Sequence, residues 1–251
     1  MLSSVLMEES MKTHSGAYPP DMSAAVVSTS HIWVKQHLAA LQANLHLSFR
    51  PLDAGELTDC ADLHAEWFPI NYTPHFFKEI GASMLSIAAV ISPRDYGDKK
   101  TEEILAGLIV FRITPHLTLQ YLRFTYLLSD VHSAYIATLG VVEELRSLGI
   151  GKELINRCRD YCLSAPSSPQ FIYLHVAAYN AEAVAFYERV GYSRIQHLRE
   201  HYNINGRNYD AYVYILYVNG GKSPLLTIAN AKQAVVSLWR LPGKLKTRLL
   251  G

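Results

Sequence analysis

Residues 146–152 combine the residue types of an anion-binding loop. Glycine at positions 149 and 151 lacks a Cβ, so an anion can approach the backbone closely. The free N–H groups at the start of the helix that should follow suit a pyrophosphate. The spacing lacks the first glycine of the dinucleotide-binding pattern, and the loop is too short for a Walker A motif. Such a loop also occurs without any ligand, so both interpretations stay open. The segment reads Arg146, Ser147, Leu148, Gly149, Ile150, Gly151, Lys152.

The elements that must position this loop alternate between strand and helix. Residues 134–142 form an apolar strand, and residues 143–163 have helical periodicity with Leu148 on the apolar face. A buried strand at 171–177 and a helix at 180–192 follow. This alternation is typical of an α/β fold with parallel strands in the middle of the sheet. Two more strands, 193–204 and 210–218, are joined by the hairpin turn Asn205-Gly206.

The part of the chain before this block supplies further strands and helices. We expect a short strand at 47–52, a helix capped by Asp53 that runs to about Trp67, a short helix at 75–80, and strands at 84–91 and 104–111. The aromatic segment 114–132 is expected to be an insertion or an extended hairpin. The chain therefore divides into a largely flexible leader with room for one short helix (1–45), a catalytic domain (46–220) and a basic amphipathic tail (221–251).

The charge distribution excludes one class of partner and suggests another. A net charge of +1 argues against a general nucleic-acid binder. After Asp210 there is no acidic residue but six Lys or Arg residues, and the helical pattern around Trp239 has one apolar face. Such a segment suits an anionic membrane surface. A C-terminal helix packed on the domain is the alternative. No apolar run is long enough to span a bilayer.

Cysteine usage indicates a reducing compartment. Cys60, Cys158 and Cys162 cannot make a closed disulfide framework. Cys158 and Cys162 stand one helical turn apart, but no second Cys or His pair lies at ligand spacing, so we predict buried thiols and no metal. The protein is expected to face the cytosol.

Two motifs together resemble the GNAT acetyltransferase superfamily. The first is Leu139-Gly140-Val141-Val142 followed by R-x-x-G-x-G and a helix, and the second is Asn180 with the Phe186-Tyr187 helix. The resemblance spans about residues 47–218 and implies a mixed sheet of about seven strands flanked by helices, with acetyl-CoA as cosubstrate. It implies acetyl-CoA contacts for Leu139, Val141, Arg146, Ser147, Gly149, Ile150, Gly151, Lys152, Asn180 and Tyr187.

Four further segments are similar to the NatF type of N-terminal acetyltransferase, which is a membrane-associated enzyme that acts as a single subunit. They begin at Trp67, Ala134, Ile172 and Tyr217. By this resemblance Tyr135 and His175 are catalytic. The residues that hold the substrate N-terminus are Phe68, Pro69, Ile70, Tyr72 and Tyr202. The implied substrates are Met-initiated N-termini of membrane proteins, with an apolar or amphipathic second residue, and no obligatory auxiliary subunit.

The chemistry of amine acetylation agrees with these roles. A protein α-amine has a pKa near 8 and must lose a proton before it attacks a thioester. His175 is suited to act as the general base, through a water, because histidine titrates near neutral pH. Tyr135 can share that water or protonate the leaving thiolate, and a backbone N–H near Val141 can stabilise the oxyanion. Without the resemblance, a strand His or Tyr is more often a core residue.

The sequence departs from the NatF pattern at three places. Asn71 stands where an acidic residue is expected, and segment 199–202 reads Arg-Glu-His-Tyr where a tyrosine cluster is expected. The aromatic segment 114–132 replaces a polar insertion. Substrate preference is therefore open, and two alternatives stand beside N-terminal acetylation, namely acetylation of lysines, including those of histones, and a non-catalytic CoA-binding membrane scaffold. The resemblance places the protein peripherally on the cytosolic face of the Golgi or the plasma membrane.

Overall fold

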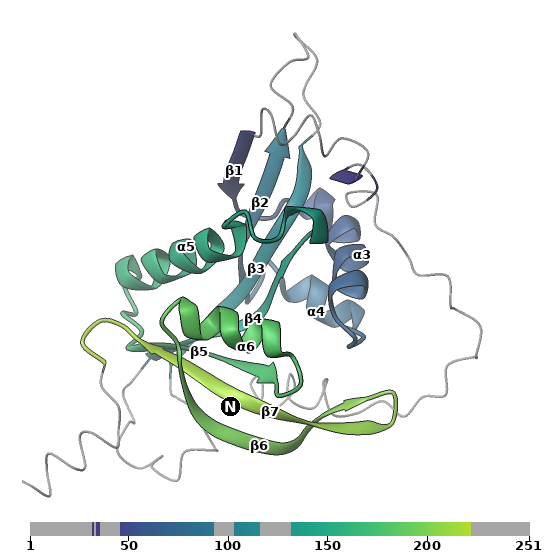
Figure 1. The fold of residues 1–251 in the computed structure, drawn as a ribbon. Coiled ribbons are helices and arrows are strands. Elements are labelled where there is room, and N and C mark those ends of the chain that lie inside the picture. Colours follow the sequence, from purple (N-terminus) through teal and green to yellow (C-terminus); the bar gives the residue numbers. More distant parts are fainter. Residues whose placement is uncertain (1–31, 33, 36–45, 93–102, 116–131, 222–251) are drawn as a thin grey trace, which may run out of the picture.

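The computed structural model describes residues 32, 34–35, 46–92, 103–115 and 132–221. These residues form one seven-stranded sheet in the order β1-β2-β3-β4-β5-β7-β6. Only the central pair β4–β5 is parallel, and every other pair of neighbours is antiparallel. The sheet is mixed, as predicted for this fold class (Figure 1).

The elements follow the predicted order. The strands are β1 (His46–Arg50), β2 (Leu85–Ser92), β3 (Ile104–Pro115), β4 (His132–Val141), β5 (Phe171–Ala177), β6 (Ser193–Ile204) and β7 (Arg207–Tyr217). The α-helices are α3 (Leu57–Trp67), α4 (Pro74–Glu79), α5 (Ile150–Ser164) and α6 (Ala181–Arg189), and two 3-10 turns are η1 (Ala54–Glu56) and η3 (Glu143–Leu145).

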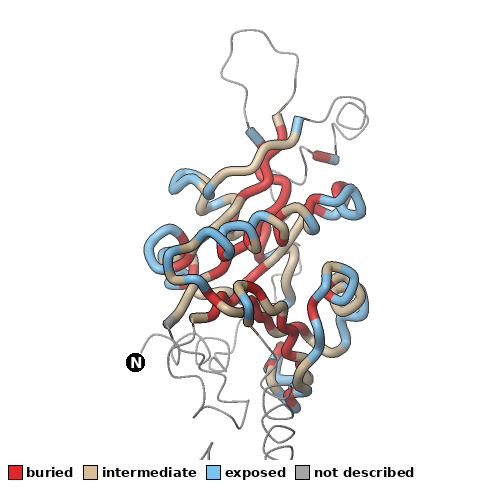
Figure 2. Tube along the Cα trace, turned by 90° about the vertical axis from the view of Figure 1, so that its left-hand side faces the viewer, coloured by how far each residue is buried: buried red, intermediate tan, exposed pale blue. Residues whose placement is uncertain are grey.

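Helices cover both faces of the sheet. A Cβ built on Gly140 of β4 would lie 2.0 Å from the Trp67 ring of α3. Successive strand residues point to opposite faces, and the neighbour Val141 shares its face with Gly107, whose built Cβ would approach Leu154 of α5 at 3.4 Å. Helices α3 and α5 therefore lie on opposite faces, and the buried residues between them form the core (Figure 2).

Local capping explains where several helices begin and end. Asp53 caps η1, from which α3 continues, and the Asp53 carboxylate accepts from the Gly55 N–H at 3.0 Å. Asn180 caps α6 by accepting from the Ala183 N–H at 3.0 Å. Gly191, at φ 95°, follows the end of α6 in the left-handed conformation that glycine tolerates.

The prediction of one helix over 143–163 was wrong at its start. Residues 143–145 form only the turn η3, and α5 begins at Ile150. The backbone of Ser147 (φ 64°) and Gly149 (φ 87°) is left-handed, which a helix cannot contain. Leu148 consequently lies outside the helix and is 55% exposed instead of belonging to the apolar face.

Other predictions lie wholly or partly outside the described residues. Strands β3 and β4 pair out to Pro115 and His132, as an extended hairpin requires, but residues 116–131 between them are not described. Of the leader, Ile32, Val34 and Lys35 are helical, and Val34 is completely buried in the core. Residues 222–251 of the predicted tail are also outside the described residues. No helix in the described part of the chain is long and apolar enough to cross a membrane.

Candidate functional site

The two parallel strands at the centre of the sheet separate after a short paired stretch. Strands β4 and β5 pair only from Ser133–Phe171 to Tyr135–Tyr173, although each strand continues beyond these residues. The backbone edges that face each other are therefore no longer hydrogen-bonded to each other past Tyr135. This separation creates an open edge in the middle of the sheet, where an extended ligand can use strand backbone groups.

Backbone N–H groups of β4 point toward this open edge. The Val142 N–H donates to the Ala106 carbonyl of the β3 side at 2.9 Å. Successive N–H groups of a strand point to opposite edges, so the N–H groups of Leu139 and Val141 point toward β5. Both residues are half-buried. This direction agrees with the prediction that Leu139 and Val141 contact acetyl-CoA, and with an oxyanion donor near Val141.

Tyr135 and His175 meet where the strands begin to separate. Tyr135 is the last residue of β4 that pairs with β5, and its hydroxyl lies 3.4 Å from His175 Nδ1. The two ring centroids are 5.6 Å apart, and Tyr173 packs against Tyr135 at 5.0 Å. Tyr135 is only 9% exposed. The geometry thus brings together the two predicted catalytic residues within reach of one shared proton or water.

The glycine loop forms a backbone nest at the start of α5. Positive φ angles at Ser147 and Gly149 turn successive N–H groups toward one side, a conformation that binds anions. A Cβ on Gly149 would meet nothing within 4 Å, so the backbone is accessible there. Gly151 lies against Phe186 of α6, 3.5 Å from the position of a built Cβ. The loop therefore fits the pyrophosphate for which it was predicted.

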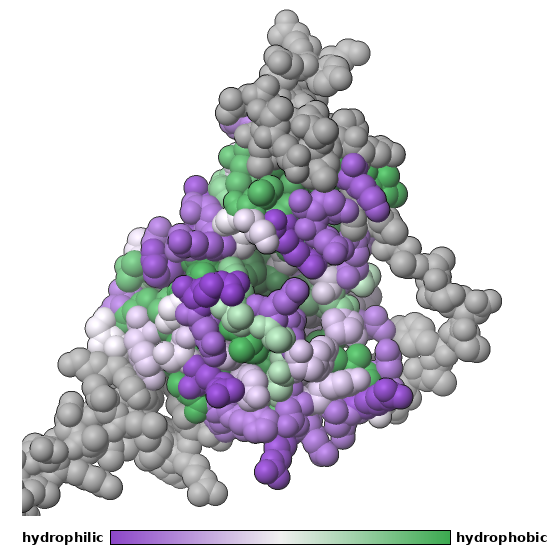
Figure 3. Space-filling model, in the orientation of Figure 1, coloured by the Kyte–Doolittle hydropathy of each residue, from purple (hydrophilic) through white to green (hydrophobic). Residues whose placement is uncertain are grey.

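Arg146 and Lys152 supply positive charge at the two ends of this loop. Arg146 is exposed, and its Nε donates to the Val141 carbonyl at 3.2 Å, which ties the loop to the end of β4. Lys152 is exposed in the first turn of α5, whereas Ile150 is buried and anchors the turn. Figure 3 shows a hollowed, hydrophobic area between α5 and α6 on this face. The anion-binding loop and the open strand edge thus adjoin one recess.

In the second segment predicted to contact acetyl-CoA, the Asn180 side chain caps helix α6. Its amide oxygen Oδ1 accepts the hydrogen bond from the Ala183 N–H. Tyr187 of α6 is buried, and burial raises the pKa of its phenol well above the ordinary value, with a smaller contribution from Cys158. Contacts of either residue with acetyl-CoA remain predictions.

The predicted substrate loop lies against the cluster that contains Tyr135. Phe68, Pro69, Ile70 and Tyr72 join α3 to α4, and Ile70 packs on the cluster that contains Tyr135 and Tyr202. Burial, and then the neighbouring phenols of Tyr135 and Tyr187, raise the pKa of Tyr72 well above the ordinary value. The pKa of Tyr202 is raised for the same reasons, by burial first and then by Tyr72 and Tyr187. Phenols from four separate elements therefore converge at the separation of β4 and β5.

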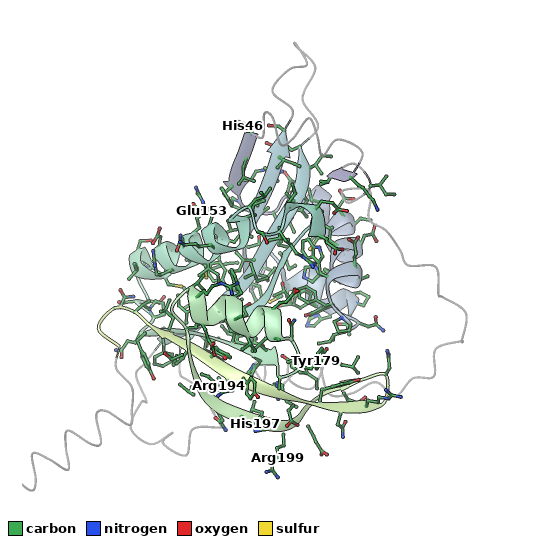
Figure 4. All side chains as sticks on the ribbon, in the orientation of Figure 1. His46, Glu153, Tyr179, Arg194, His197 and Arg199 are labelled. Carbon is green, nitrogen blue, oxygen red and sulfur yellow. The ribbon has the colours of Figure 1, made fainter. Side chains whose placement is uncertain are left out.

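Pro69 and Asn71 are exposed, so the loop presents a mixed apolar and polar surface outward. Tyr179, which is 53% exposed, packs on Tyr209 at 5.0 Å and lies between α6 and the β6–β7 hairpin (Figure 4). Ile70 of the loop and Tyr202 and Tyr209 of the hairpin pack in one cluster with Tyr135, so both segments adjoin the predicted catalytic residues.

His64 lies beside the predicted site, and the sequence analysis did not single it out. Its ring is 1% exposed, its Nδ1–H donates to the Cys60 carbonyl at 2.8 Å, and its Nε2 accepts from the Thr138 hydroxyl at 3.1 Å. Burial lowers the pKa of His64 to about 4, although the bond to Cys60 opposes this change. The His64 ring packs against the rings of Phe68 and Tyr72, with ring centroids 5.4 and 5.2 Å apart. His64 thus joins β4 to the substrate loop as a neutral residue.

His201 is the second residue that was missed, and it stacks on His175 at 4.7 Å between ring centroids. The sequence contained one sign of it, the departure from a tyrosine cluster at 199–202. No sequence spacing indicated that a β6 side chain would reach a β5 side chain across β7.

The three cysteines are free and buried, as predicted. Among the described residues no three His, Cys, Asp or Glu side chains are grouped so that they could hold a metal ion.

Comparison with known proteins places this geometry in a family. Residues 57–192 match the model of the Acetyltransferase (GNAT) family. The chain is 30% identical over 182 residues to the histone acetyltransferase MCC1 of Arabidopsis thaliana, covering 71% of this chain and 72% of that protein. It is 32% identical over 166 residues to the N-alpha-acetyltransferase 60 of Xenopus tropicalis, covering 65% of this chain and 66% of that protein.

Solved structures show the same relationship. Arabidopsis thaliana NAA60 in complex with a bisubstrate analogue superposes with a TM-score of 0.61 at 33% identity, over 70% of this chain and 99% of that one. The same protein in complex with acetyl-CoA superposes with a TM-score of 0.60 at 32% identity, over 70% of this chain and 100% of that one. The chain therefore belongs to the GNAT acetyltransferase family, is an acyltransferase that uses acetyl-CoA, and is similar to N-alpha-acetyltransferases of the NatF type.

Proposed function

We propose that the protein acetylates the α-amine of Met-initiated N-termini, with an apolar residue or lysine second, by direct transfer from acetyl-CoA. One observation carries the proposal, the Tyr135–His175 pair at the separation of β4 and β5, enclosed by the substrate loop and the β6–β7 hairpin. Two walls suit a flexible N-terminus, which can enter a narrow channel end first. The similarity to N-alpha-acetyltransferase 60 supports the same substrate class.

In the proposed mechanism His175 accepts a proton from the substrate ammonium through a water. The neutral nitrogen attacks the thioester carbon, and the Val141 N–H stabilises the oxygen that becomes negative. The carbon–sulfur bond then breaks, the thiolate takes a proton from Tyr135 or the shared water, and the new amide loses its extra proton to solvent. No covalent enzyme intermediate is needed, which agrees with burial of all three cysteines.

Two substitutions test these roles. Tyr135→Phe and His175→Ala are expected to lower kcat at least about a hundredfold, the usual contribution of a positioned acid or base. The acetyl-CoA affinity and the thermal unfolding temperature should stay close to wild type, because neither residue lies in the glycine loop. Unchanged turnover in both variants would remove the pair from the mechanism.

Acetylation of lysine, including histone lysine, is the second candidate, because one relative is named a histone acetyltransferase. A lysine side chain on a folded protein has to pass between the same two walls. Efficient transfer to an internal lysine of a peptide with a blocked α-amine would favour this candidate. A catalytically idle CoA-binding scaffold is disfavoured, because Tyr135, His175 and the glycine loop are all intact.

The tail is proposed to hold the enzyme peripherally on the cytosolic face of the Golgi or the plasma membrane. The support is its composition, six cations and an apolar helical face without any acidic residue. The chain is held to the domain just before the tail, because the Asn219 side-chain amide donates to the carbonyls of Cys162 and Pro169 at 3.1 and 2.8 Å.

A truncation after Gly221 keeps this attachment intact and removes residues 222–251. It should abolish binding to anionic vesicles while acetylation of peptides in solution continues. Persistent vesicle binding by the truncated protein would place the anchor elsewhere.

A further inference from the structure

A bulge in strand β6 carries His201 toward the catalytic centre. Leu198 pairs with Ala211 and Tyr202 with Tyr209, so three residues of β6 lie opposite the single residue Asp210 of β7. The middle one, Glu200, has a positive φ of 51°. Such a bulge bends the strand and redirects its side chains.

Asp210 holds the bulge in place. One carboxylate oxygen accepts the Glu200 N–H at 2.9 Å, and the other lies 2.7 Å from His197 Nε2. These two partners, Glu200 first and His197 second, hold the pKa of Asp210 below its usual range. The carboxylate is thus charged near neutral pH, and the strained backbone at Glu200 has a fixed hydrogen-bond partner. Arg199, next to it, extends outward from the hairpin (Figure 4).

The bulge places the His201 ring flat against the His175 ring. The centroids lie 4.7 Å apart with 29° between the planes, whereas Tyr135 and Tyr173 meet His175 edge-on. Tyr202 in turn holds His201 edge-on at 4.8 Å. The imidazole of the proposed base is therefore enclosed by rings from β4, β5 and β6, and one of these rings can itself be charged.

We propose that His201 is a positioning residue for His175. The stacked His201 ring fixes the catalytic imidazole of His175 and opposes protonation of that imidazole. This inference rests on the proposed role of His175 as general base. Two imidazolium rings in van der Waals contact repel each other, so the pair takes up its second proton only at lower pH than an isolated histidine would. His175 then stays neutral, and competent as a base, in a larger fraction of molecules below neutral pH.

The surroundings leave the two histidines as the groups that titrate. Ionisable side chains around this part of the site include Tyr72, Arg112, Tyr135, Tyr173, Tyr187 and Tyr202, and Glu200 lies exposed in the bulge itself. Of these residue types and histidine, only histidine ordinarily changes charge between pH 6 and 8. The Arg112 guanidinium, 5.6 Å from the Tyr135 ring centroid, adds a fixed positive charge that further disfavours imidazolium.

The first test is the pH dependence of kcat/KM from pH 5.5 to 8.5. His201→Phe keeps a stacked ring but removes its charge, so the acidic limb should move up by about half to one pH unit. At pH 8.5, well above the pKa of an ordinary histidine, the difference between the variant and wild type should be smallest. The substrate amine titrates identically in all assays and cancels in the comparison.

Two further variants separate charge from packing. His201→Ala removes the ring, so kcat should fall at pH 8.5 as well, because the His175 orientation is lost. The matched control is His75→Phe, since His75 is an exposed histidine of α4 outside the site, and its profile should coincide with wild type. Coincident acidic limbs for His201→Phe and wild type would overturn the inference, and His201→Tyr gives the same comparison if the Phe variant does not fold.

An NMR titration of the His175 ring makes the test independent of the proposed function. The titration midpoint of His175 should be higher in His201→Phe than in wild type by about half to one pH unit, the same shift that is expected of the acidic limb in the kinetic profile. An unchanged midpoint contradicts the inference whatever the activity does. Unchanged turnover in His175→Ala would instead contradict the proposed base, while the NMR result would still decide whether the rings are coupled.

Discussion

Burial of a neutral His64 predicts a measurable loss of stability in mild acid. The folded-state pKa of about 4 lies below the ordinary 6.5, because burial disfavours the imidazolium. Between these two values the unfolded chain binds more protons than the folded one, so the free energy of unfolding falls as pH decreases. The stabilising contribution is complete above pH 6.5, and it is lost progressively as the pH falls from there to about 4.

The magnitude follows from the same two values. Each pKa unit corresponds to about 1.4 kcal/mol, so the full loss below pH 4 is about 3 kcal/mol. Between pH 7.5 and pH 5 the linkage relation gives a loss of about 2 kcal/mol from this residue. That is a large share of the stability of a typical domain, about 5 to 15 kcal/mol.

Urea unfolding at pH 7.5, 6.5, 5.5 and 5 measures this loss in wild type and in His64→Gln. Glutamine can still accept from Thr138 but does not titrate, so the variant should be less stable at pH 7.5 yet lose about 2 kcal/mol less on acidification. His75→Gln, at an exposed position of α4, should keep the wild-type pH dependence. A His64→Gln curve parallel to wild type, within about 0.5 kcal/mol, would refute the reasoning.

Two further predictions concern the glycines and the anion-binding loop. Gly140→Ala should destabilise the fold by about 2 to 3 kcal/mol in thermal unfolding, because the new methyl group collides with the Trp67 ring. The control Gly55→Ala should be almost neutral in the same assay, because its new methyl group would have its nearest contact at 3.7 Å. Equal stability of the two variants would contradict the packing of α3 on β4. Arg146→Ala should weaken acetyl-CoA binding about tenfold in calorimetry, or about 1.4 kcal/mol, and leave the unfolding temperature unchanged, whereas Arg159→Ala, farther along α5, should bind like wild type; equal affinities in all three proteins would exclude Arg146 from the site.

Local patterns in the sequence were sufficient for most of the fold. The Asp53 and Asn180 caps, the Asn205-Gly206 turn and the strand–loop–helix order depend on near neighbours, and the structure has each of them. The start of α5 was misjudged because Arg146, Ser147 and Leu148 are compatible with a helix, whereas the positive φ of Ser147 is a property of the folded loop.

The site could be predicted only as far as motifs reach. The motifs predicted catalytic roles for Tyr135 and His175, but their 3.4 Å approach depends on the order of β4 and β5 in the sheet. The link from His64 to Thr138 joins residues 74 positions apart, and no periodicity encodes it. His201 reaches His175 only because β6 bulges opposite Asp210. These are tertiary contacts, which a single sequence specifies without displaying.

The central claim is that the α-amine of a peptide is the acceptor. Four peptides test it most directly with radiolabelled acetyl-CoA: Met-Leu and Met-Lys N-termini, each with a free or a pre-acetylated α-amine. We expect transfer to both free peptides and none to either blocked one. Transfer to the blocked Met-Lys peptide, at a rate matching the free one, would contradict the account and make lysine the acceptor.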